Sequence, residues 1–170
     1  MIIDKNAKHL IVLFNSVFGR AYNVVLSSDS GEPDYRASTE PTMPNVVNFA
    51  NGYFNSALHE IAHWVIAGEL RRKQDDYGYW YTEDGRSPEQ QKLFQQLEVF
   101  PQAIEKAFCE ALERSFQASI DNLDNPLSKA EIVRFENEIE AKKCQLQEQG
   151  FPSRAQQFLN ALSTQFAYDY

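Results

Sequence analysis

Two of the three histidines in this 170-residue chain, His59 and His63, lie four positions apart with Glu60 between them. Residues four apart share one face of an α-helix, so both imidazoles can reach a single metal ion. The alternative is a pair of core histidines bonded to backbone carbonyls or to a carboxylate, because a buried imidazole needs a partner. The His-Glu-x-x-His pattern favours the metal site.

The residues around the pair predict the helix that such a site needs. Apolar side chains recur at i, i+3, i+4 and i+7 from Phe54 to Val65, and both histidines lie off this apolar stripe. Asn55 or Ser56 is the expected helix cap. Gly68 either loosens the last turn or ends the helix.

Two histidines rarely complete a functional metal site, and the remaining histidine, His9, falls on a polar edge of the N-terminal helix. The third ligand is therefore expected to be a carboxylate. Glu98 is attractive because its neighbours in sequence are apolar, which suggests an interior carboxylate that needs a partner. The candidates are Glu69, Asp75, Asp76, Glu98, Glu105 and Glu110.

Two histidines and one carboxylate leave open positions on a metal, as in the non-haem Fe(II) oxygenases that bind O2 beside a substrate C–H bond. On Zn²⁺ the same ligands give a hydrolase, because the metal lowers the pKa of bound water to about 7. Glu60 would be the catalytic base of a peptidase. In an oxygenase it would hold a ligand histidine, a water or a cationic substrate. A third interpretation is a binding protein that the metal only stabilises.

The composition limits the class of partner. A net charge of −8 argues against direct contact with nucleic acid and suits a cationic target. Cys109 and Cys144 are too few and too far apart for a metal or redox pair, which favours a reducing compartment. The N-terminus lacks a signal-peptide layout, and no apolar run approaches the roughly 20 residues that span a bilayer. We therefore expect a soluble, cytoplasmic monomer.

The fold expected is one α+β domain over residues 1–170, mostly helical, with a small sheet and the histidine helix at its centre. The three predicted strands are Tyr22 to Ser27, Asn45 to Ala50 and Tyr77 to Tyr81. A turn-rich loop from Ser27 to Pro33 follows the first strand.

The other helices are predicted from periodicity and from their end signals. Pro101 disfavours helical geometry at Phe100, so the chain is expected to bend there. A loop is expected from Asp121 to Pro126, followed by a capping box at Ser128. The predicted helices cover residues 5–18, ending before Gly19; 88–99; 101–116; 128–149, ended by Gly150; and 153–166.

Five short motifs occur in order along the chain. They are residues 54–68 with His59-Glu60-Ile61-Ala62-His63-Trp64; Gly78-Tyr79-Trp80-Tyr81; Asp84-Gly85-Arg86; Glu98-Val99 with Pro101-Gln102-Ala103; and Asp121-Asn122-Leu123. Together they resemble the bacterial elongation factor P hydroxylase family. The resemblance runs from about Leu10 to the last motif, and the final 45 residues match less distinctively.

The resemblance implies a metal-dependent enzyme that hydroxylates a lysine of elongation factor P after that lysine has been extended with a β-lysyl group. It also implies His59, His63 and Glu98 as metal ligands, which singles out Glu98 among the carboxylates above. Fe(II) with O2 as co-substrate is expected, and Zn²⁺ in a peptidase-like hydrolase is the alternative. No arginine arrangement typical of a 2-oxoglutarate clamp is evident, and Arg86 stays open as a candidate.

The lysyl-extended lysine carries closely spaced ammonium groups, so its pocket is expected to hold carboxylates beyond the metal ligand. Tyr79, Trp80 and Tyr81 could contact the aliphatic stem or make cation–π contacts. Packing in a buried strand or core cluster is the other interpretation of these aromatic residues. The acidic candidates, each of which could instead cap a turn, are Asp75, Asp76, Asp84 and Asp121.

Overall fold

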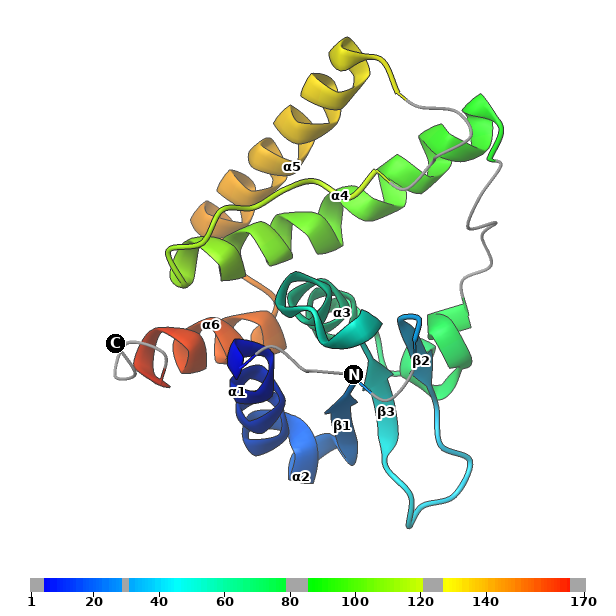
Figure 1. Cartoon of the computed structure of the whole chain (residues 1–170), viewed down its shortest axis with the longest axis vertical. Helices are drawn as coiled ribbons and strands as arrows, with labels where there is room; N and C mark the ends of the chain where they lie inside the picture. Colours follow the sequence, from blue (N-terminus) through cyan, green and yellow to red (C-terminus); the bar gives the residue numbers. More distant parts are fainter. Residues whose placement is uncertain (1–4, 29–30, 79–85, 121–126, 166–170) are drawn as a thin grey trace. The chain divides into compact units, whose positions relative to one another are not determined.

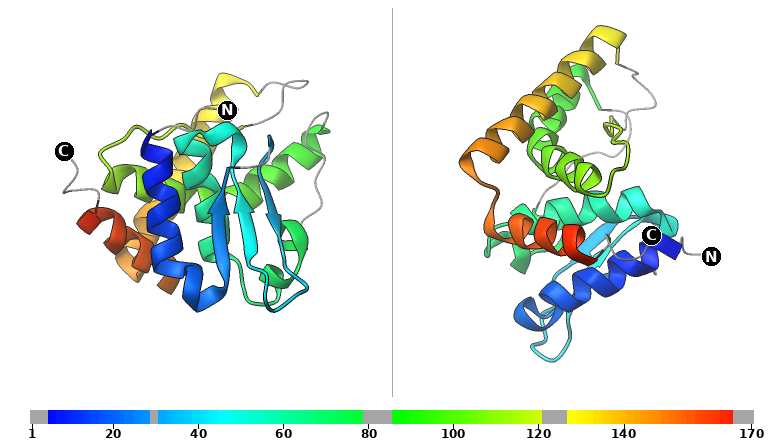
Figure 2. Two further views of the ribbon diagram at one scale, coloured as in Figure 1. Left: turned by 60° about the horizontal axis from the view of Figure 1, so that its bottom comes forward. Right: turned by 90° about the vertical axis from the view of Figure 1, so that its left-hand side faces the viewer.

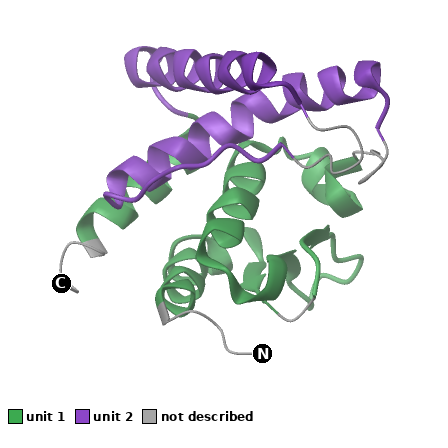
Figure 3. Cartoon of the chain, turned by 45° about the horizontal axis from the view of Figure 1, so that its top comes forward, with its two compact units in different colours: residues 1–79, 152–170 green, residues 80–151 purple. Residues whose placement is uncertain are grey.

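The computed structural model describes residues 5–28, 31–78, 86–120 and 127–165. The chain packs as two compact units, coloured separately in Figure 3. Unit 1 comprises Met1–Tyr79 and Pro152–Tyr170, and unit 2 comprises Trp80–Phe151. The single hydroxylase domain over residues 1–170 stays a prediction.

The α+β prediction is confirmed, since the described chain is mostly helical with one small three-stranded sheet (Figure 1). None of the helices in the described ranges combines the length and apolar character that a bilayer crossing requires.

The sheet belongs to unit 1, and its strands β1 Val24–Ser27, β3 Asn45–Asn48 and β2 Asp34–Arg36 lie in that spatial order (Figure 2). β1 pairs with β3 in parallel, and β2 pairs with β3 antiparallel. Leu26, Val47 and Tyr35 lie at one register position across the sheet, and all three are buried. This row forms the core side of the sheet.

Two of the three predicted strands are confirmed, as β1 and β3, and the third is wrong where it is described. Tyr77 lies in the 3₁₀ turn η4 Asp75–Gly78, with a left-handed backbone (φ 57°) that a strand does not contain. Residues 79–81 lie outside the described ranges. The third strand is β2, which the sequence analysis left without structure because three residues are too few to show an alternating pattern.

The N-terminal helix runs past the glycine that was expected to end it. α1 Lys5–Phe14 continues through a π-helical segment, Asn15–Gly19, into α2 Arg20–Tyr22. Gly19 has ordinary helical geometry, and Asn23 takes the left-handed conformation (φ 48°) that ends the helix. Asparagine is among the few residues that tolerate this conformation, so it replaces glycine at the helix end.

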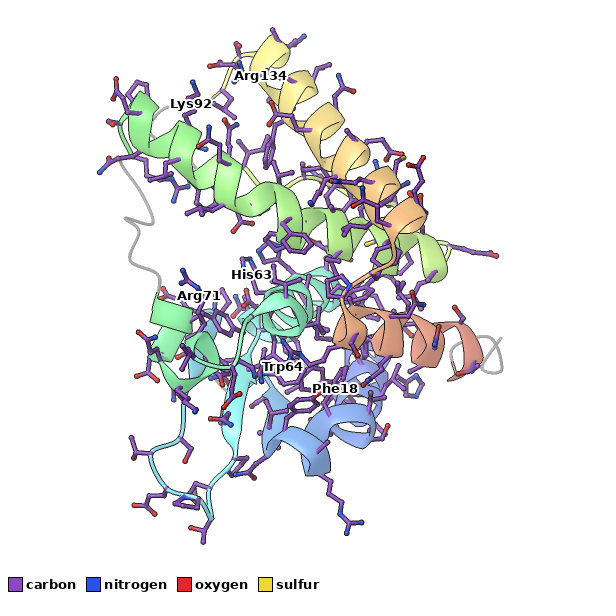
Figure 4. The ribbon with its side chains drawn as sticks, turned by 180° about the vertical axis from the view of Figure 1, so that it is seen from behind. Phe18, His63, Trp64, Arg71, Lys92 and Arg134 are labelled. Atoms are coloured by element: carbon purple, nitrogen blue, oxygen red, sulfur yellow. The ribbon has the colours of Figure 1, made fainter. Side chains whose placement is uncertain are left out.

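The histidine helix, α3 Phe54–Ile66, packs against β3 and against helices α1 and α6 Ser153–Gln165. Its Trp64 contacts Phe14 and Phe18 edge-on or tilted, at centroid distances of 5.1 and 4.9 Å, and Phe158 of α6 joins the same cluster. Figure 4 shows Trp64 beside Phe18, while His63 leaves α3 on a different side. The core of unit 1 therefore fixes α3 from the face that carries no histidine.

Both ends of α3 differ from the ends predicted from the sequence. The helix begins at Phe54, so the predicted cap at Asn55 or Ser56 is wrong, and the Ser56 hydroxyl instead accepts a hydrogen bond from the Ala50 amide (2.9 Å). Its C-terminal end turns extended at Ala67, before Gly68. The Ala67 carbonyl accepts hydrogen bonds from the guanidinium groups of Arg72 and Arg154, which place positive charge at the negative end of the helix dipole.

Unit 2 is built on two long helices that pack on each other, α4 Pro88–Ala111 and α5 Lys129–Gln149. Both begin with a capping box, at Ser87 and at Ser128, and the one at Ser128 was predicted from the sequence. The predicted bend at Phe100 is wrong because α4 runs through Pro101.

The helix accommodates Pro101 because the carbonyl that loses its partner belongs to Leu97, which is exposed to water. α4 ends at Ala111, before the predicted end at residue 116, and the left-handed Glu113 (φ 53°) follows. The predicted loop at 121–126 lies outside the described residues. α5 ends at Gly150 (φ 97°) as expected, and α6 matches its predicted range to within one residue.

Candidate metal centre

His59 and His63 project from one side of α3, one turn apart, and both are half-buried. Their Nε2 atoms are 3.2 Å apart, and the two rings meet edge to face. Two nitrogen ligands about 2.0–2.1 Å from one metal ion would be roughly 2.9–3.4 Å apart at octahedral to tetrahedral angles. The pair is therefore already spaced as two ligands of one ion.

Glu60 follows His59 on α3 and is half-buried. Its carboxylate lies near enough to the phenol of Tyr77 to raise the pKa of that phenol. The catalytic role of Glu60 stays a prediction.

Tyr77 is the residue of this site that the sequence analysis missed. Its ring stacks on Tyr35 at a centroid distance of 4.4 Å and lies parallel to the His63 ring at 6.5 Å. Its hydroxyl is buried and has no hydrogen-bond partner among the described residues. Burial raises the pKa of Tyr77 well above 10, and the Glu60 carboxylate raises it further, so the phenol stays protonated. The only sequence signal was the aromatic run that Tyr77 opens, which was assigned to a strand.

Two acidic candidates for substrate binding hold backbone amides of the β2 region. The Asp76 carboxylate accepts a hydrogen bond from the Tyr35 amide (2.9 Å), and Asp75 accepts one from the Ala37 amide (2.8 Å). These contacts fasten the η4 turn to the sheet, so the turn-anchoring interpretation has direct support. Their substrate role stays a prediction. The other candidates, Tyr79, Trp80, Tyr81, Asp84 and Asp121, lie outside the described residues.

Glu98 lies on α4 in unit 2 and is 7% exposed, which confirms the expected interior carboxylate. The Gln102 amide nitrogen donates to Glu98 Oε2 (3.1 Å) and to the Ser119 carbonyl (2.9 Å). The Gln102 amide oxygen accepts from the Ser119 backbone N–H (3.0 Å). Gln102 is thus fixed at both ends of its amide, so it orients the Glu98 carboxylate.

The other carboxylates that the sequence offered as a third metal ligand lie in different surroundings. Glu69 is exposed and pairs with Lys73 (3.1 Å), and Glu110 pairs with the buried Lys143 (2.6 Å). Glu105 is buried on α4.

Arg86, the candidate for a 2-oxoglutarate clamp, is buried at the start of α4. It donates to the Gln91 side chain (2.8 Å) and lies over the Phe94 ring, 4.0 Å from the centroid. The Gln91 side chain in turn donates to the Ile120 carbonyl. These contacts give Arg86 a role in holding the segment before residue 121 on α4.

Comparison with known proteins gives the family. The model of the elongation factor P hydroxylase family matches residues 13–170, so the match includes the C-terminal part that the motifs covered less distinctively. The chain is also 38% identical over 161 residues to the elongation factor P lysine hydroxylase of Haemophilus influenzae. That alignment covers 94% of this chain and 89% of the relative. The chain belongs to the elongation factor P hydroxylase family.

Proposed function

We propose that this hydroxylase adds a hydroxyl group to the lysine of elongation factor P that carries a β-lysyl extension, and that it does so with a bound divalent metal. Membership in the family makes the chain an oxidoreductase, and the relative from Haemophilus influenzae is named for the lysine of elongation factor P. The single observation that carries the metal is the 3.2 Å separation of the His59 and His63 nitrogens.

The proposed ligands are His59 and His63 of unit 1 and Glu98 of unit 2. The resemblance to the hydroxylase family implies this ligand set, and within unit 1 the 3.2 Å separation of the two histidine nitrogens supports it. The fit rests on chemistry, since two imidazoles and a carboxylate suit Fe(II) and leave coordination positions open. Zn²⁺ accepts the same ligands, so metal identity is part of the test.

Fe(II) at this site would supply activation of O2 for hydroxylation of a substrate C–H bond, with electrons from a reductant. The chain's own residues do the positioning. The core around Trp64 fixes the helix that carries both histidines, and Gln102 orients Glu98. Glu60, which follows His59 in sequence, would attract the ammonium group of the substrate lysine.

Charge supports the choice of substrate. The chain has a net charge of −8, and a lysine extended by a second lysine carries closely spaced positive charges. Asp75, Asp76 and Asp121 with Tyr79 and Trp80 are the proposed substrate contacts, and a monomer is the proposed form. Because elongation factor P works in translation, the cytoplasm is the proposed location.

The zinc peptidase alternative is not favoured, since the family and the relative both name hydroxylation. The discriminating experiment is elemental analysis of protein purified without oxygen, followed by reaction with elongation factor P that does or does not carry the β-lysyl group. Mass spectrometry is expected to show an added oxygen atom on the extended form only. Peptide cleavage by zinc-loaded protein without oxygen would contradict the proposal.

A further inference from the structure

In the part of the chain that the structure describes, one of the two stacked phenols of unit 1 makes a hydrogen bond and the other makes none. The Tyr35 hydroxyl donates a hydrogen bond to the Arg72 carbonyl (2.8 Å). The Tyr77 hydroxyl, on the ring stacked against that of Tyr35, is buried and has no partner within residues 5–28, 31–78, 86–120 and 127–165. A buried polar group without a hydrogen bond is unfavourable, so an orphan of this kind in a native fold points to a group that is absent or to a functional role.

The backbone that carries Tyr77 is strained. Asp76, Tyr77 and Gly78 have successive φ values of 45°, 57° and 70°, all in the left-handed region. Only the last of these residues is a glycine, and a bulky tyrosine is disfavoured in this conformation. Such strain persists only where the surroundings over-determine it, and it concentrates at functional sites.

The surroundings of the turn do fix it. Asp76 and Asp75 accept hydrogen bonds from backbone amides of the β2 region, and Arg71 donates to the Tyr77 carbonyl (3.1 Å). The Tyr35 ring covers one face of Tyr77. Three hydrogen bonds and a stacked ring therefore hold Tyr77 in an unfavourable backbone conformation.

The side chain held in this way lies beside the histidine pair. Its ring is parallel to that of His63, with an interplanar angle of 11° and 6.5 Å between the ring centroids. The ring that carries the buried hydroxyl without a described partner is therefore the ring that the fold holds beside His63.

We propose that Tyr77 is a ligand-binding residue of this site, whose hydroxyl donates a hydrogen bond to a small oxygen or nitrogen acceptor bound beside His63. The inference rests on the proposed metal centre, because an open coordination position is what would hold such an acceptor. A bound acceptor would supply the hydrogen-bond partner that the Tyr77 hydroxyl lacks among the described residues. The strained turn holds the hydroxyl in position before the acceptor binds.

The test compares Tyr77→Phe with Tyr35→Phe, two changes that each remove one phenolic oxygen from the same stacked pair. In the metal-free protein, Tyr35→Phe is expected to lower the urea midpoint because a made hydrogen bond is lost. Tyr77→Phe is expected to leave the midpoint unchanged or raise it. A fall as large as that of Tyr35→Phe would overturn the inference, because the phenol would then have a partner within the fold.

The second measurement uses cobalt(II)-loaded protein and azide, a small anionic acceptor, followed by the visible spectrum. Tyr77→Phe is expected to bind cobalt normally and azide at least roughly 10-fold more weakly, the loss of one hydrogen bond to a charged acceptor. Tyr35→Phe should match the wild type. Equal azide affinity in Tyr77→Phe and wild type overturns the inference alone. Failure of the wild type to bind cobalt contradicts the proposed metal centre, and the inference falls with it.

Discussion

Replacing His63 by alanine is expected to remove metal-induced stabilisation while leaving the metal-free fold nearly unchanged. The imidazole is half-buried, and its ring lies against the rings of His59 and Tyr77. Contacts of this kind are worth about 0.5–1.5 kcal/mol, and alanine returns roughly 0.5 kcal/mol of helix propensity. The free energy of unfolding of the metal-free variant should therefore fall by about 1 kcal/mol or less.

The metal-loaded protein should respond much more strongly. At a free metal concentration 100 times Kd, a ligand that binds only the folded state adds about 2.7 kcal/mol, which raises Tm by roughly 5–10 °C in a chain of this size. If loss of one ligand weakens binding about 100-fold, the gain at the same metal concentration drops to about 0.4 kcal/mol. The shift in Tm would then shrink to about 1–2 °C.

The assay is thermal unfolding of wild type and His63→Ala, each with and without cobalt(II), followed by circular dichroism. His9→Ala is the matched control, because His9 is exposed on α1 and is expected to keep the full shift. A His63→Ala protein that keeps the wild-type shift, or a His9→Ala protein that loses it, would refute the assignment of the metal to the α3 pair.

Three further predictions concern unit 2. Gln102→Leu leaves the Ser119 backbone without its amide partner and Glu98 without its donor, so urea unfolding should show a loss of about 2 kcal/mol or more. Metal affinity should also fall roughly 10- to 100-fold, and an unchanged affinity would remove Gln102 from the proposed site. Hydrogen bonds from two lysines lower the pKa of Glu140 from 4.5 to about 2, so its ionised form adds stability above pH 4.5 that is lost as the pH falls toward 2. As the pH falls over this range, the free energy of unfolding of Glu140→Gln should therefore decrease less than that of wild type. The difference should be at most about 1 kcal/mol because the group is exposed, and parallel acid-unfolding curves for the two proteins would contradict this. Gly150→Ala should lower the free energy of unfolding by about 1 kcal/mol through backbone strain alone, since φ is 97° and a Cβ would meet nothing within 4 Å. An unchanged urea midpoint would argue against this strain.

The elements that sequence predicted well are those whose signals are local. The apolar stripe predicted α3, Pro88 fits the first helical position of α4, and the capping box at Ser128 predicted the start of α5. Each signal depends on residues within one or two helical turns, so no knowledge of tertiary structure was needed.

The elements that sequence missed depend on distant partners. β2 is three residues long and exists through pairing with β3 and through hydrogen bonds that the amides of Tyr35 and Ala37 donate to Asp76 and Asp75, about forty positions along the chain. The break predicted at Pro101 failed for a related reason, because packing of α4 outweighs one lost helical hydrogen bond.

The residues of the candidate site also differ in whether local signals or distant parts of the chain determine their positions. The spacing of His59 and His63 is a property of one helix and was predicted directly. Tyr77 reaches the pair through a turn with successive left-handed residues. An aspartate such as Asp76 tolerates that conformation, but a tyrosine gives no signal for it. Glu98 was singled out by resemblance, and its apolar neighbours predicted its burial.

The most direct test of the proposed reaction follows the oxygen atom. Protein purified without oxygen and loaded with Fe(II) would react with β-lysylated elongation factor P under isotopically labelled O2 and a reductant, and the modified peptide would be weighed by mass spectrometry. We expect one labelled oxygen atom on the extended lysine with wild type and His9→Ala, and none with His63→Ala. An unmodified lysine with wild type, an oxygen atom derived from water, or full turnover by His63→Ala would contradict a hydroxylase whose metal is held by the α3 histidines.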